Sequence, residues 1–389
     1  MTQVVTRFVE ELSWKERDLP QKERTKHVHG IHPYMGKYVP QLVDYFLDRH
    51  FKIGDTILDP FVGSGTTLIE ANTHSMNGVG IDISEFNILL SKVKTDSYDL
   101  PLLKKEFADI VRRVKEDIKT NNIETKIDDF LSGNPIGEKQ PSVRMEEASE
   151  YLRTWYHPIA LYPLLAMRNM IQEYHYQDAL KVLLSRTARS SRLAPHYQLD
   201  FPDHPFTEDY YCHKHARTCH PTTNAMGFLV RYSIDTYNRI AAFQKLRTNN
   251  SVSLIHGDSR NVDLPKSSGV ITSPPYVGLI DYHEQHRYAY ELLGLQDKSE
   301  KEIGAKKAKN GKKATEAYRD SITKVISRLG RSTEGPIVFV VNDKYGLYET
   351  ISQDAGVRIV ERLKRKVDRR TGRRSSGDFF EDMIVMMPP

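Results

Sequence analysis

A glycine-containing loop between an apolar run and a helical stretch has residue types suited to binding a small ligand. Residues 55–71 read DTILDPFVGSGTTLIEA. Gly63 and Gly65 allow the backbone to approach a ligand and direct the N-terminus of the following helix toward it. No lysine follows Gly65, so the loop is not a nucleoside-triphosphate P-loop. Leu68 stands where a dinucleotide-binding fingerprint requires its third glycine.

Two acids near this loop indicate the kind of ligand. Asp59 directly precedes the loop and would repel a phosphate, so it suits a cationic or amine-bearing ligand. Asp82 ends the next predicted strand, where a carboxylate can accept hydrogen bonds from ribose hydroxyls. The alternative is an ordinary strand–turn–helix with capping residues.

A second segment, ITSPPYVG at 271–278, places a hydroxyl, two prolines and an aromatic ring where an apolar run stops. Pro274 and Pro275 fix two φ angles and remove two backbone donors, so the segment joins neither a helix nor a sheet. The nearby carbonyls and the Ser273 hydroxyl are then free to accept hydrogen bonds, with Tyr276 beside them. The alternative is a Pro-Pro turn with a buried tyrosine.

The elements that position these segments alternate between strands and helices. A helix is predicted from Pro40 to Phe51, and strand–helix pairs at 55–71 and 78–95. Further strands are predicted at 251–265, 269–276 and 336–343, and an antiparallel pair at 356–368 and 378–387. This order predicts an α/β fold with a mostly parallel sheet and an antiparallel C-terminal hairpin.

The organisation along the chain divides it into three parts. Residues 1–24 are polar and are expected to form an N-terminal arm. The α/β unit comprises 25–99 and 251–389. Residues 100–250 are rich in charge, tyrosine and histidine, with helical stretches and no clear strand, and are expected to be a largely helical inserted region.

Composition places the chain in a broad class. It has 389 residues, 39% hydrophobic and 28% charged, a net charge of +5 and two cysteines. A disulfide framework is excluded, and a reducing cytoplasm is expected. We find no signal peptide and no apolar stretch of ~20 residues, the length of a membrane span. The mild basic excess is compatible with a polyanionic partner.

Together, DPFVGSGTT, the acid after the second strand and TSPPY after a later strand resemble the amino-methyltransferases of DNA. These enzymes transfer a methyl group from S-adenosylmethionine to N4 of cytosine or N6 of adenine. The resemblance covers roughly residues 27–95 and 251–389 and implies a Rossmann-like methyltransferase fold. The cofactor loop precedes the catalytic loop here, which departs from the commoner order among serine-bearing members.

The resemblance also implies roles for individual residues. Asp82 would hold the ribose, and Asp258 in HGDSR would lie near the adenine amine. The other implied cofactor-binding residues are Asp59, Phe61, Gly63, Gly65 and Thr66 in the loop, and His32, Tyr34 and Lys37 in HPYMGK.

The expected chemistry explains the TSPPY residues. The lone pair of an exocyclic amine is delocalised, so two acceptors aimed at its N–H groups would free it. Ser273 and the Pro274 carbonyl can serve, in a loop stiffened by Pro275. Tyr276 would stack on a base flipped out of the duplex. Positioning would supply most of the catalysis, without a covalent intermediate.

The residue before Pro-Pro bears on the target base. By the resemblance, Ser273 favours N4 of cytosine, whereas members acting on adenine usually have Asp or Asn there. N6-adenine methylation by the same mechanism is therefore the alternative. Carbon-5 methylation is disfavoured because neither cysteine follows a proline. An RNA or small-substrate methyltransferase and a non-enzymatic nucleic-acid-binding protein are further rivals.

Double-stranded DNA is the expected partner, with a cognate restriction endonuclease in a prokaryotic restriction–modification system. Residues 100–250 are the candidate target-recognition region. Two groups of arginines are candidate DNA contacts, namely Arg186, Arg189 and Arg192, and Arg369, Arg370, Arg373 and Arg374. For the first group, a solvated helix face is the alternative. The recognition sequence and the oligomeric state stay open.

A segment rich in cysteine and histidine, CHKHARTCH at 212–220, raises the question of a metal site. Its donors are Cys212, His213, His215, Cys219 and His220. They could satisfy tetrahedral zinc, but their spacing matches no standard finger and neighbouring residues cannot all face one ion. A histidine-rich surface segment is favoured, and we expect no metal.

Overall fold

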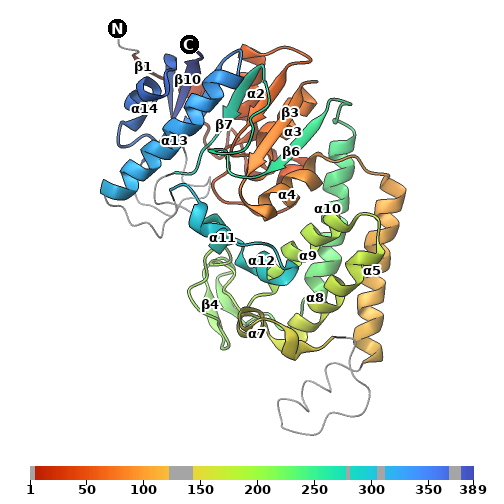
Figure 1. The fold of residues 1–389 in the computed structure, drawn as a ribbon. Coiled ribbons are helices and arrows are strands. Elements are labelled where there is room, and N and C mark those ends of the chain that lie inside the picture. The colour runs from red at the N-terminus through yellow and green to blue at the C-terminus, as the bar shows by residue number, and fades with distance from the viewer. Residues whose placement is uncertain (1–4, 122–142, 277–280, 305–311, 368–377) are drawn as a thin grey trace.

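The computed structural model describes residues 5–121, 143–276, 281–304, 312–367 and 378–389. A sheet with helices on both faces forms one part, and a group of helices forms the other (Figure 1). Within the described residues, no helix is long and apolar enough to cross a membrane.

The large sheet has eight strands in the order β1-β9-β10-β8-β7-β2-β3-β6. All neighbouring pairs are parallel except those of β10 with β8 and β9. The predicted α/β fold with an antiparallel C-terminal hairpin is therefore confirmed. The strands are β1 (Thr6–Phe8), β2 (Thr56–Asp59), β3 (Asn77–Asp82), β6 (Val252–His256), β7 (Gly269–Thr272), β8 (Ile337–Val341), β9 (Arg358–Val367) and β10 (Phe379–Met387).

Alternate residues of the central strands pack against helices on opposite faces. Ile57 and Val338 pack with α2 and α3, whereas Leu58 and Phe339 pack with α13 and α14. A strand buried on both faces reads as a continuous apolar run, which is why IVFVV in β8 shows no alternation. The helices are α2 (Pro40–His50), α3 (Thr66–Thr73), α13 (Lys312–Ser332) and α14 (Leu347–Ala355).

The N-terminal segment packs on the sheet, in contrast to the expected arm. Strand β1 pairs with β9, and three apolar side chains of this segment, Val9, Leu12 and Leu19, are buried beside α2. The polar composition of residues 1–24 hid these three anchors, because they lie at irregular spacing between charged residues. The short helix α1 (Gln21–Arg24) ends the segment.

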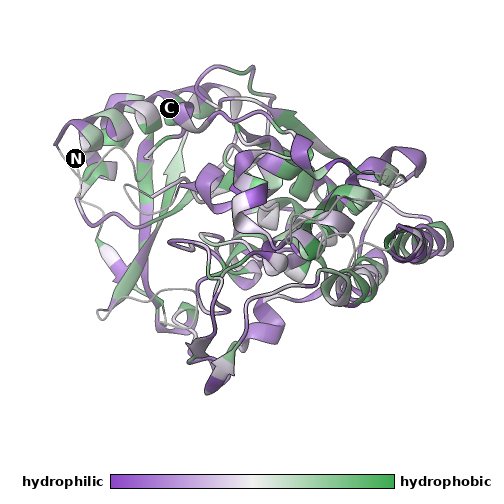
Figure 2. Cartoon of the chain, turned by 90° about the horizontal axis from the view of Figure 1, so that it is seen from below, coloured by the Kyte–Doolittle hydropathy of each residue, from purple (hydrophilic) through white to green (hydrophobic). Residues whose placement is uncertain are grey.

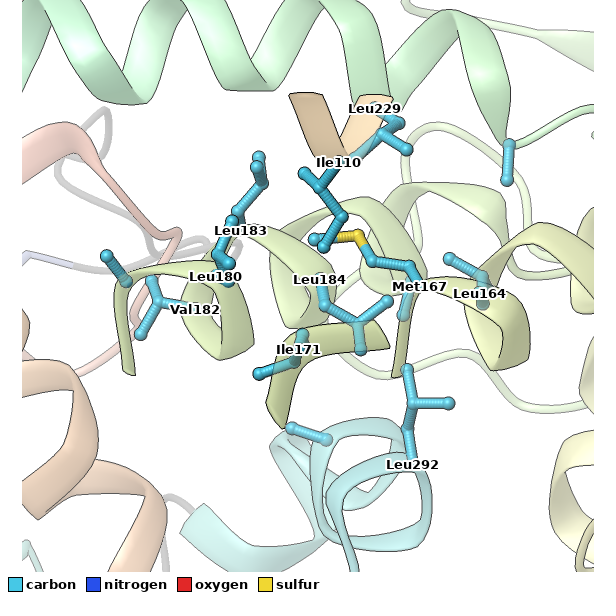
Figure 3. Close-up of a cluster of buried hydrophobic side chains, with 14 of the residues drawn as sticks. Ile110, Leu164, Met167, Ile171, Leu180, Val182, Leu183, Leu184, Leu229 and Leu292 are labelled. Carbon is cyan, nitrogen blue, oxygen red and sulfur yellow. The ribbon is translucent and has the colours of Figure 1, made fainter. Parts of the chain in front are cut away.

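The helical part lies between α4 and β6 in the sequence, and α12 from the chain after TSPPY also packs into it. Figure 3 shows its core, where Leu184, Met167 and Leu292 approach one another. In Figure 2 its long helices alternate between hydrophilic and hydrophobic colours, as amphipathic helices do. Its helices are α5 (Leu100–Thr120), α7 (Glu150–Trp155), α8 (Pro158–Met170), α9 (Gln177–Ser191), α10 (Met226–Gln244) and α12 (Arg287–Leu293). Helix α4 (Glu85–Thr95) precedes this part, and α11 (Tyr282–Gln285) precedes α12.

A small hairpin corrects the expectation of no strand in this region. Strands β4 (Tyr210–Cys212) and β5 (Arg217–Cys219) form a separate antiparallel pair. Short 3-10 helices lie at Glu10–Leu12, His27–Gly30, Met145–Glu147, Ile171–Glu173 and Ser299–Lys301. The division into residues 25–99 with 251–389 and an inserted 100–250 stays a prediction.

The order of the parallel strands reverses between β2 and β7. The chain proceeds from β2 to β3 and β6 on one side, and from β7 to β8 on the other. The loops that follow β2 and β7 therefore leave the same edge of the sheet in diverging directions. Ligands of doubly wound sheets bind at such a point, outside the carboxyl ends of the strands.

Candidate active site

The carboxylate of Asp59 joins the two loops at this point. Its Oδ1 accepts hydrogen bonds from Thr272 Oγ1 (2.6 Å) and Phe61 N (3.1 Å), and its Oδ2 accepts one from Thr67 Oγ1 (2.5 Å). Asp59 is 1% exposed. Burial raises its pKa to about 6, although the hydrogen bonds from Thr272, Thr67 and Phe61 oppose the shift. One side chain thus fixes the end of β2, the start of α3 and the end of β7 together.

The glycine loop is held by Asp82 on the neighbouring strand. The Asp82 carboxylate accepts hydrogen bonds from Gly63 N (2.8 Å) and Ser84 N (2.9 Å). Burial raises the pKa of Asp82, and these two N–H donors oppose the shift. Gly65 precedes α3 with φ of 82°, and Gly63 has φ of 49°, a conformation that favours glycine. A Cβ at Gly63 would lie 3.1 Å from the Tyr34 hydroxyl.

A cavity of about 780 Å³, open to solvent, lies where the two loops meet. The wall brings together nine of the residues predicted from the sequence. They are Tyr34, Lys37, Phe61, Gly63, Thr66, Asp82, Asp258, Ser273 and Pro275.

Asp258 and Lys37 are two charged groups of the wall besides Asp82. Asp258 pairs with Arg260, Oδ2 to Nη2 at 2.8 Å. Burial raises the pKa of Asp258, but the hydrogen bonds and charge of Arg260 outweigh burial, and the net shift is downward. Lys37 donates from Nζ to the His29 carbonyl at 2.7 Å. Burial, with the charge of Arg239, lowers the pKa of Lys37 to about 8.

Three predicted cofactor residues are absent from the cavity wall. Asp59 lies beneath the loop, and Gly65 packs against Ser91 at the start of α3. His32 is 1% exposed, and its Nδ1 lies 2.8 Å from the Pro33 carbonyl. Burial lowers the pKa of His32 well below its ordinary value, so the ring is neutral. For these residues the structure shows packing and bracing contacts.

The TSPPY segment leaves β7 beside the cavity. Ser273 and Pro275 line the wall, whereas Pro274 is buried behind them. Tyr276 donates from its hydroxyl to Glu381 Oε1 (3.2 Å) on β10, and burial raises its pKa well above the ordinary value. A hydrogen bond with the Ser273 side chain opposes that shift. The serine and the tyrosine of the motif therefore lie within reach of each other.

The structure adds an aromatic and acidic wall that sequence reasoning missed. Tyr34 stacks on Tyr282, with ring centroids 5.8 Å apart and planes at 22°. Tyr282 and Glu302 both line the cavity. Glu302 pairs with His283 through one oxygen, and within the described residues its Oε2 has no hydrogen-bond partner. The only signal was aromatic residues soon after TSPPY, and Glu302 lies in a lysine-rich stretch that hid it.

The arginines of α9 correct one expectation. Arg186 contacts Asp235 (Nη1 to Oδ2, 2.6 Å) and Arg189 contacts Asp200 (Nη2 to Oδ1, 2.6 Å), with each arginine side chain 12% exposed. Arg192 is 2% exposed, and its guanidinium lies 4.5 Å from the Tyr288 ring centroid. These side chains brace the helical part and leave little surface for DNA. Arg369, Arg370, Arg373 and Arg374 lie outside the described residues.

Several known proteins are similar in sequence to this chain. A family model described as DNA methylase, of the N6/N4 type, matches residues 9–92. The type II methyltransferase M.MjaII of Methanocaldococcus jannaschii is 37% identical over 433 positions, covering 95% of this chain and 82% of the relative. This chain belongs to the N4/N6 DNA amino-methyltransferase family.

A further sequence relative and two solved structures show weaker similarity to this chain. The type II methyltransferase M.BsoBI of Geobacillus stearothermophilus is 24% identical over 302 positions, covering 73% of this chain and 56% of that protein. TrmN from Thermus thermophilus has a TM-score of 0.34 and 10% identity, covering 91% of this chain and 50% of that one. The rRNA methyltransferase AviRa of Streptomyces viridochromogenes has a TM-score of 0.33, 10% identity, and coverage of 92% and 88%.

The bond between Asp59 and Thr272 should be measurable as a coupling energy. In a double-mutant cycle of Asp59→Ala and Thr272→Val, urea unfolding at pH 7 should give a coupling of about 1.5–3 kcal/mol, because the acceptor is charged. Thr73→Val on α3 is the matched control, since its hydroxyl bonds to Glu70 O instead. Its cycle with Asp59→Ala should be additive within ~0.5 kcal/mol. Additivity in the Thr272 cycle would contradict the bridge.

The raised pKa of Asp59 predicts a specific pH dependence of stability. Between the unfolded pKa of 3.8 and the folded value of about 6, the folded state keeps a proton that the unfolded chain has released. Stability from this group therefore falls as pH rises through that window, by about 3 kcal/mol in total. Asp59→Asn should lose this slope when unfolding free energies are measured at pH 4, 5, 6 and 7. Identical slopes in both proteins would refute the shift.

Proposed function

We propose that this chain transfers a methyl group from S-adenosylmethionine to the exocyclic N4 amine of a flipped cytosine in a specific DNA sequence. The observation that carries the proposal is the meeting of the glycine loop and the TSPPY loop at one cavity, with Ser273 on its wall. Membership of the amino-methyltransferase family supplies the reaction class, and Ser273 supplies the choice of base.

The residues of the cavity fit the proposed cofactor. The backbone of Gly63 approaches the cavity where a side chain would meet Tyr34, so a ligand can contact it closely. We propose that Asp82 accepts hydrogen bonds from the ribose and that Asp258 lies near the adenine. Glu302 offers a buried acceptor oxygen that the rest of the described chain leaves without a partner. Several carboxylates around one cavity suit a ligand that carries a sulfonium and an ammonium group.

The other cofactor residues have a place in the same proposal. Phe61 and Thr66 contribute cavity surface on the side of the glycine loop, and Tyr34 and Lys37 contribute surface from the HPYMGK segment. We propose that Asp59, Gly65 and His32 do not touch the cofactor and instead hold the glycine loop and the cavity wall in position. When bound, S-adenosylmethionine supplies an electrophilic methyl group on a positively charged sulfur.

The chain's own residues prepare the amine. Ser273 Oγ and the Pro274 carbonyl accept hydrogen bonds from its two N–H groups, which withdraws the lone pair from the ring and makes it available. Pro274 and Pro275 keep these acceptors in place without competing donors. The Thr272–Asp59 bond lies immediately before them and fixes the start of the loop. Preorganised acceptors of this kind need no rearrangement during the reaction.

Tyr276 is the proposed stacking surface for the base. Its hydroxyl is anchored on Glu381, and Glu381 is in turn held by Arg365 (Oε2 to Nη2, 2.6 Å). An anchored ring loses little further freedom when a base stacks on it, so more of the stacking energy is available to offset base flipping, which costs ~a few kcal/mol.

DNA binding and biological context complete the proposal. The DNA is double-stranded, residues 100–250 read its sequence, and a cognate restriction endonuclease cuts the unmethylated site. Two relatives are named type II methyltransferases, which supports this context. Because Arg186, Arg189 and Arg192 have internal partners, other side chains of that region must reach the bases.

The product identifies the base. Incubation with radiolabelled S-adenosylmethionine and mixed-sequence duplex DNA, followed by nucleoside mass spectrometry, should yield N4-methylcytosine. N6-methyladenine as the product would favour the adenine alternative. In a parallel incubation with RNA, label in RNA but not in DNA would assign another substrate. Absence of methyl transfer to any nucleic acid would contradict the proposal.

Ser273→Ala tests the role of the hydroxyl. We expect kcat to fall on the order of 10²-fold, as when one preorganised hydrogen-bonding group is removed elsewhere, while cofactor affinity stays unchanged. Ser253→Ala on β6, an exposed serine, is the matched control and should keep full activity. The measurements are single-turnover methyl transfer and calorimetric binding of S-adenosylhomocysteine. Weaker cofactor binding with normal turnover at saturating cofactor would show that Ser273 binds the cofactor and does not activate the amine.

A further inference from the structure

Four metal-binding side chains converge outside the cavity, at the β4–β5 hairpin of the helical part. They are His196, which follows α9, together with Cys212, His215 and Cys219 of the hairpin. Their ligand atoms all lie within 4.8 Å of one another. We propose that these four residues bind a structural zinc ion.

The distances match those expected around one ion. Zinc bonds of ~2.3 Å to sulfur and ~2.0–2.1 Å to nitrogen, in tetrahedral geometry, place a sulfur and a nitrogen ligand roughly 3.6 Å apart. Cys212 Sγ lies 3.8 Å from His196 Nδ1 and 3.6 Å from His215 Nδ1. His215 Nδ1 lies 3.4 Å from Cys219 Sγ. All three contacts are close to the tetrahedral edge.

Hydrogen bonding alone does not account for this convergence. A thiol has one proton, and Nδ1 of a neutral imidazole has either one proton or one lone pair. Cys212 Sγ nevertheless faces two imidazole nitrogens, and His215 Nδ1 faces two sulfurs. A central cation satisfies all four atoms at once. On binding, the two thiol protons leave to solvent, and two thiolates balance the charge of the ion.

The local fold needs such a support. Each strand of the hairpin has three residues, and a two-stranded hairpin is marginal by itself in water. Its hydrophobic cluster holds Tyr210, Cys212 and Cys219 as buried residues, with Tyr197 and Phe206 beside them. A small module with so little core is typically stabilised by disulfides or a metal. The chain has only two cysteines, and both lie here.

The ligand set differs from the one the sequence offered. His220 pairs with Asp209 through its Nδ1 (2.5 Å), and its side chain is 77% exposed. His213 is exposed, with its ring 5.1 Å from that of Tyr211. His196 completes the set from 16 residues before Cys212. The spacing Cys-x2-His-x3-Cys becomes interpretable only with this distant fourth ligand.

The site also links to the rest of the helical part. Between His196 and the hairpin, the Asp200 carboxylate pairs with Arg189, and the Leu199 carbonyl accepts from Arg192. Arg192 in turn lies over Tyr288 of α12. Arg189 of α9 and Arg192, which follows it, thus hold the segment between His196 and the hairpin near α12.

Metal content tests the proposal directly. The full-length protein, purified without chelator from zinc-supplemented cells, should contain about one zinc ion per chain by mass spectrometry. Cys212→Ser and Cys219→Ser should each lose it. His213→Ala and His220→Ala are matched controls from the same segment and should keep it. Equal loss in the control variants, or a wild type with less than ~0.1 zinc per chain, would overturn the proposal.

A second measurement covers variants that fail to fold. Cobalt exchanged into the wild type should give thiolate-to-metal charge-transfer bands and tetrahedral d–d bands, and an organomercurial should release about one zinc as two thiols react. A Cys212–Cys219 disulfide in protein purified under mildly oxidising conditions with no bound metal would contradict the site.

Discussion

The buried carboxylate of Asp59 is the constraint on which the two loops depend. The strand order of the sheet places the ends of β2 and β7 side by side, but each end is followed by a loop without regular structure. Asp59 ends β2 and accepts three hydrogen bonds, from the backbone of the glycine loop, from the first turn of α3 and from the end of β7. Its ionised form is disfavoured by burial, so these donors are what make a carboxylate tolerable there. The geometry between the glycine loop and TSPPY follows from this one group.

The cavity combines this constraint with a wall from the helical part. Tyr34 and Tyr282 stack on each other in its wall, and α12, which follows Tyr282 in the sequence, packs into the helical core. The arginines of α9 and the proposed zinc module stiffen the same region. The helical part is physically continuous with the site, which suits a region proposed to read DNA while the base is held.

Local sequence signals were sufficient to predict the helices and strands, whereas the roles of individual side chains became clear only from tertiary contacts. The strand–loop–helix at 55–71 and the C-terminal hairpin could be predicted because apolar runs, glycines and chain order specify them. Asp59 was expected at the cofactor, but it lies beneath the loop, where it accepts a hydrogen bond from Thr272. The sequence did not indicate this contact because the two residues are 213 positions apart. The spacing of Arg186, Arg189 and Arg192 could not reveal their internal partners, and the segment at 212–220 could not reveal His196.

We propose that the cofactor binds in the cavity between the glycine loop and TSPPY. A crystal structure with S-adenosylhomocysteine tests it most directly, and requires no knowledge of the DNA site. In that structure we expect the ribose hydroxyls to donate hydrogen bonds to Asp82 and the adenine to lie beside Asp258. The sulfur should face Ser273 and Pro275 across the cavity. A cofactor bound elsewhere, or bound here with its sulfur turned away from Ser273, would contradict it.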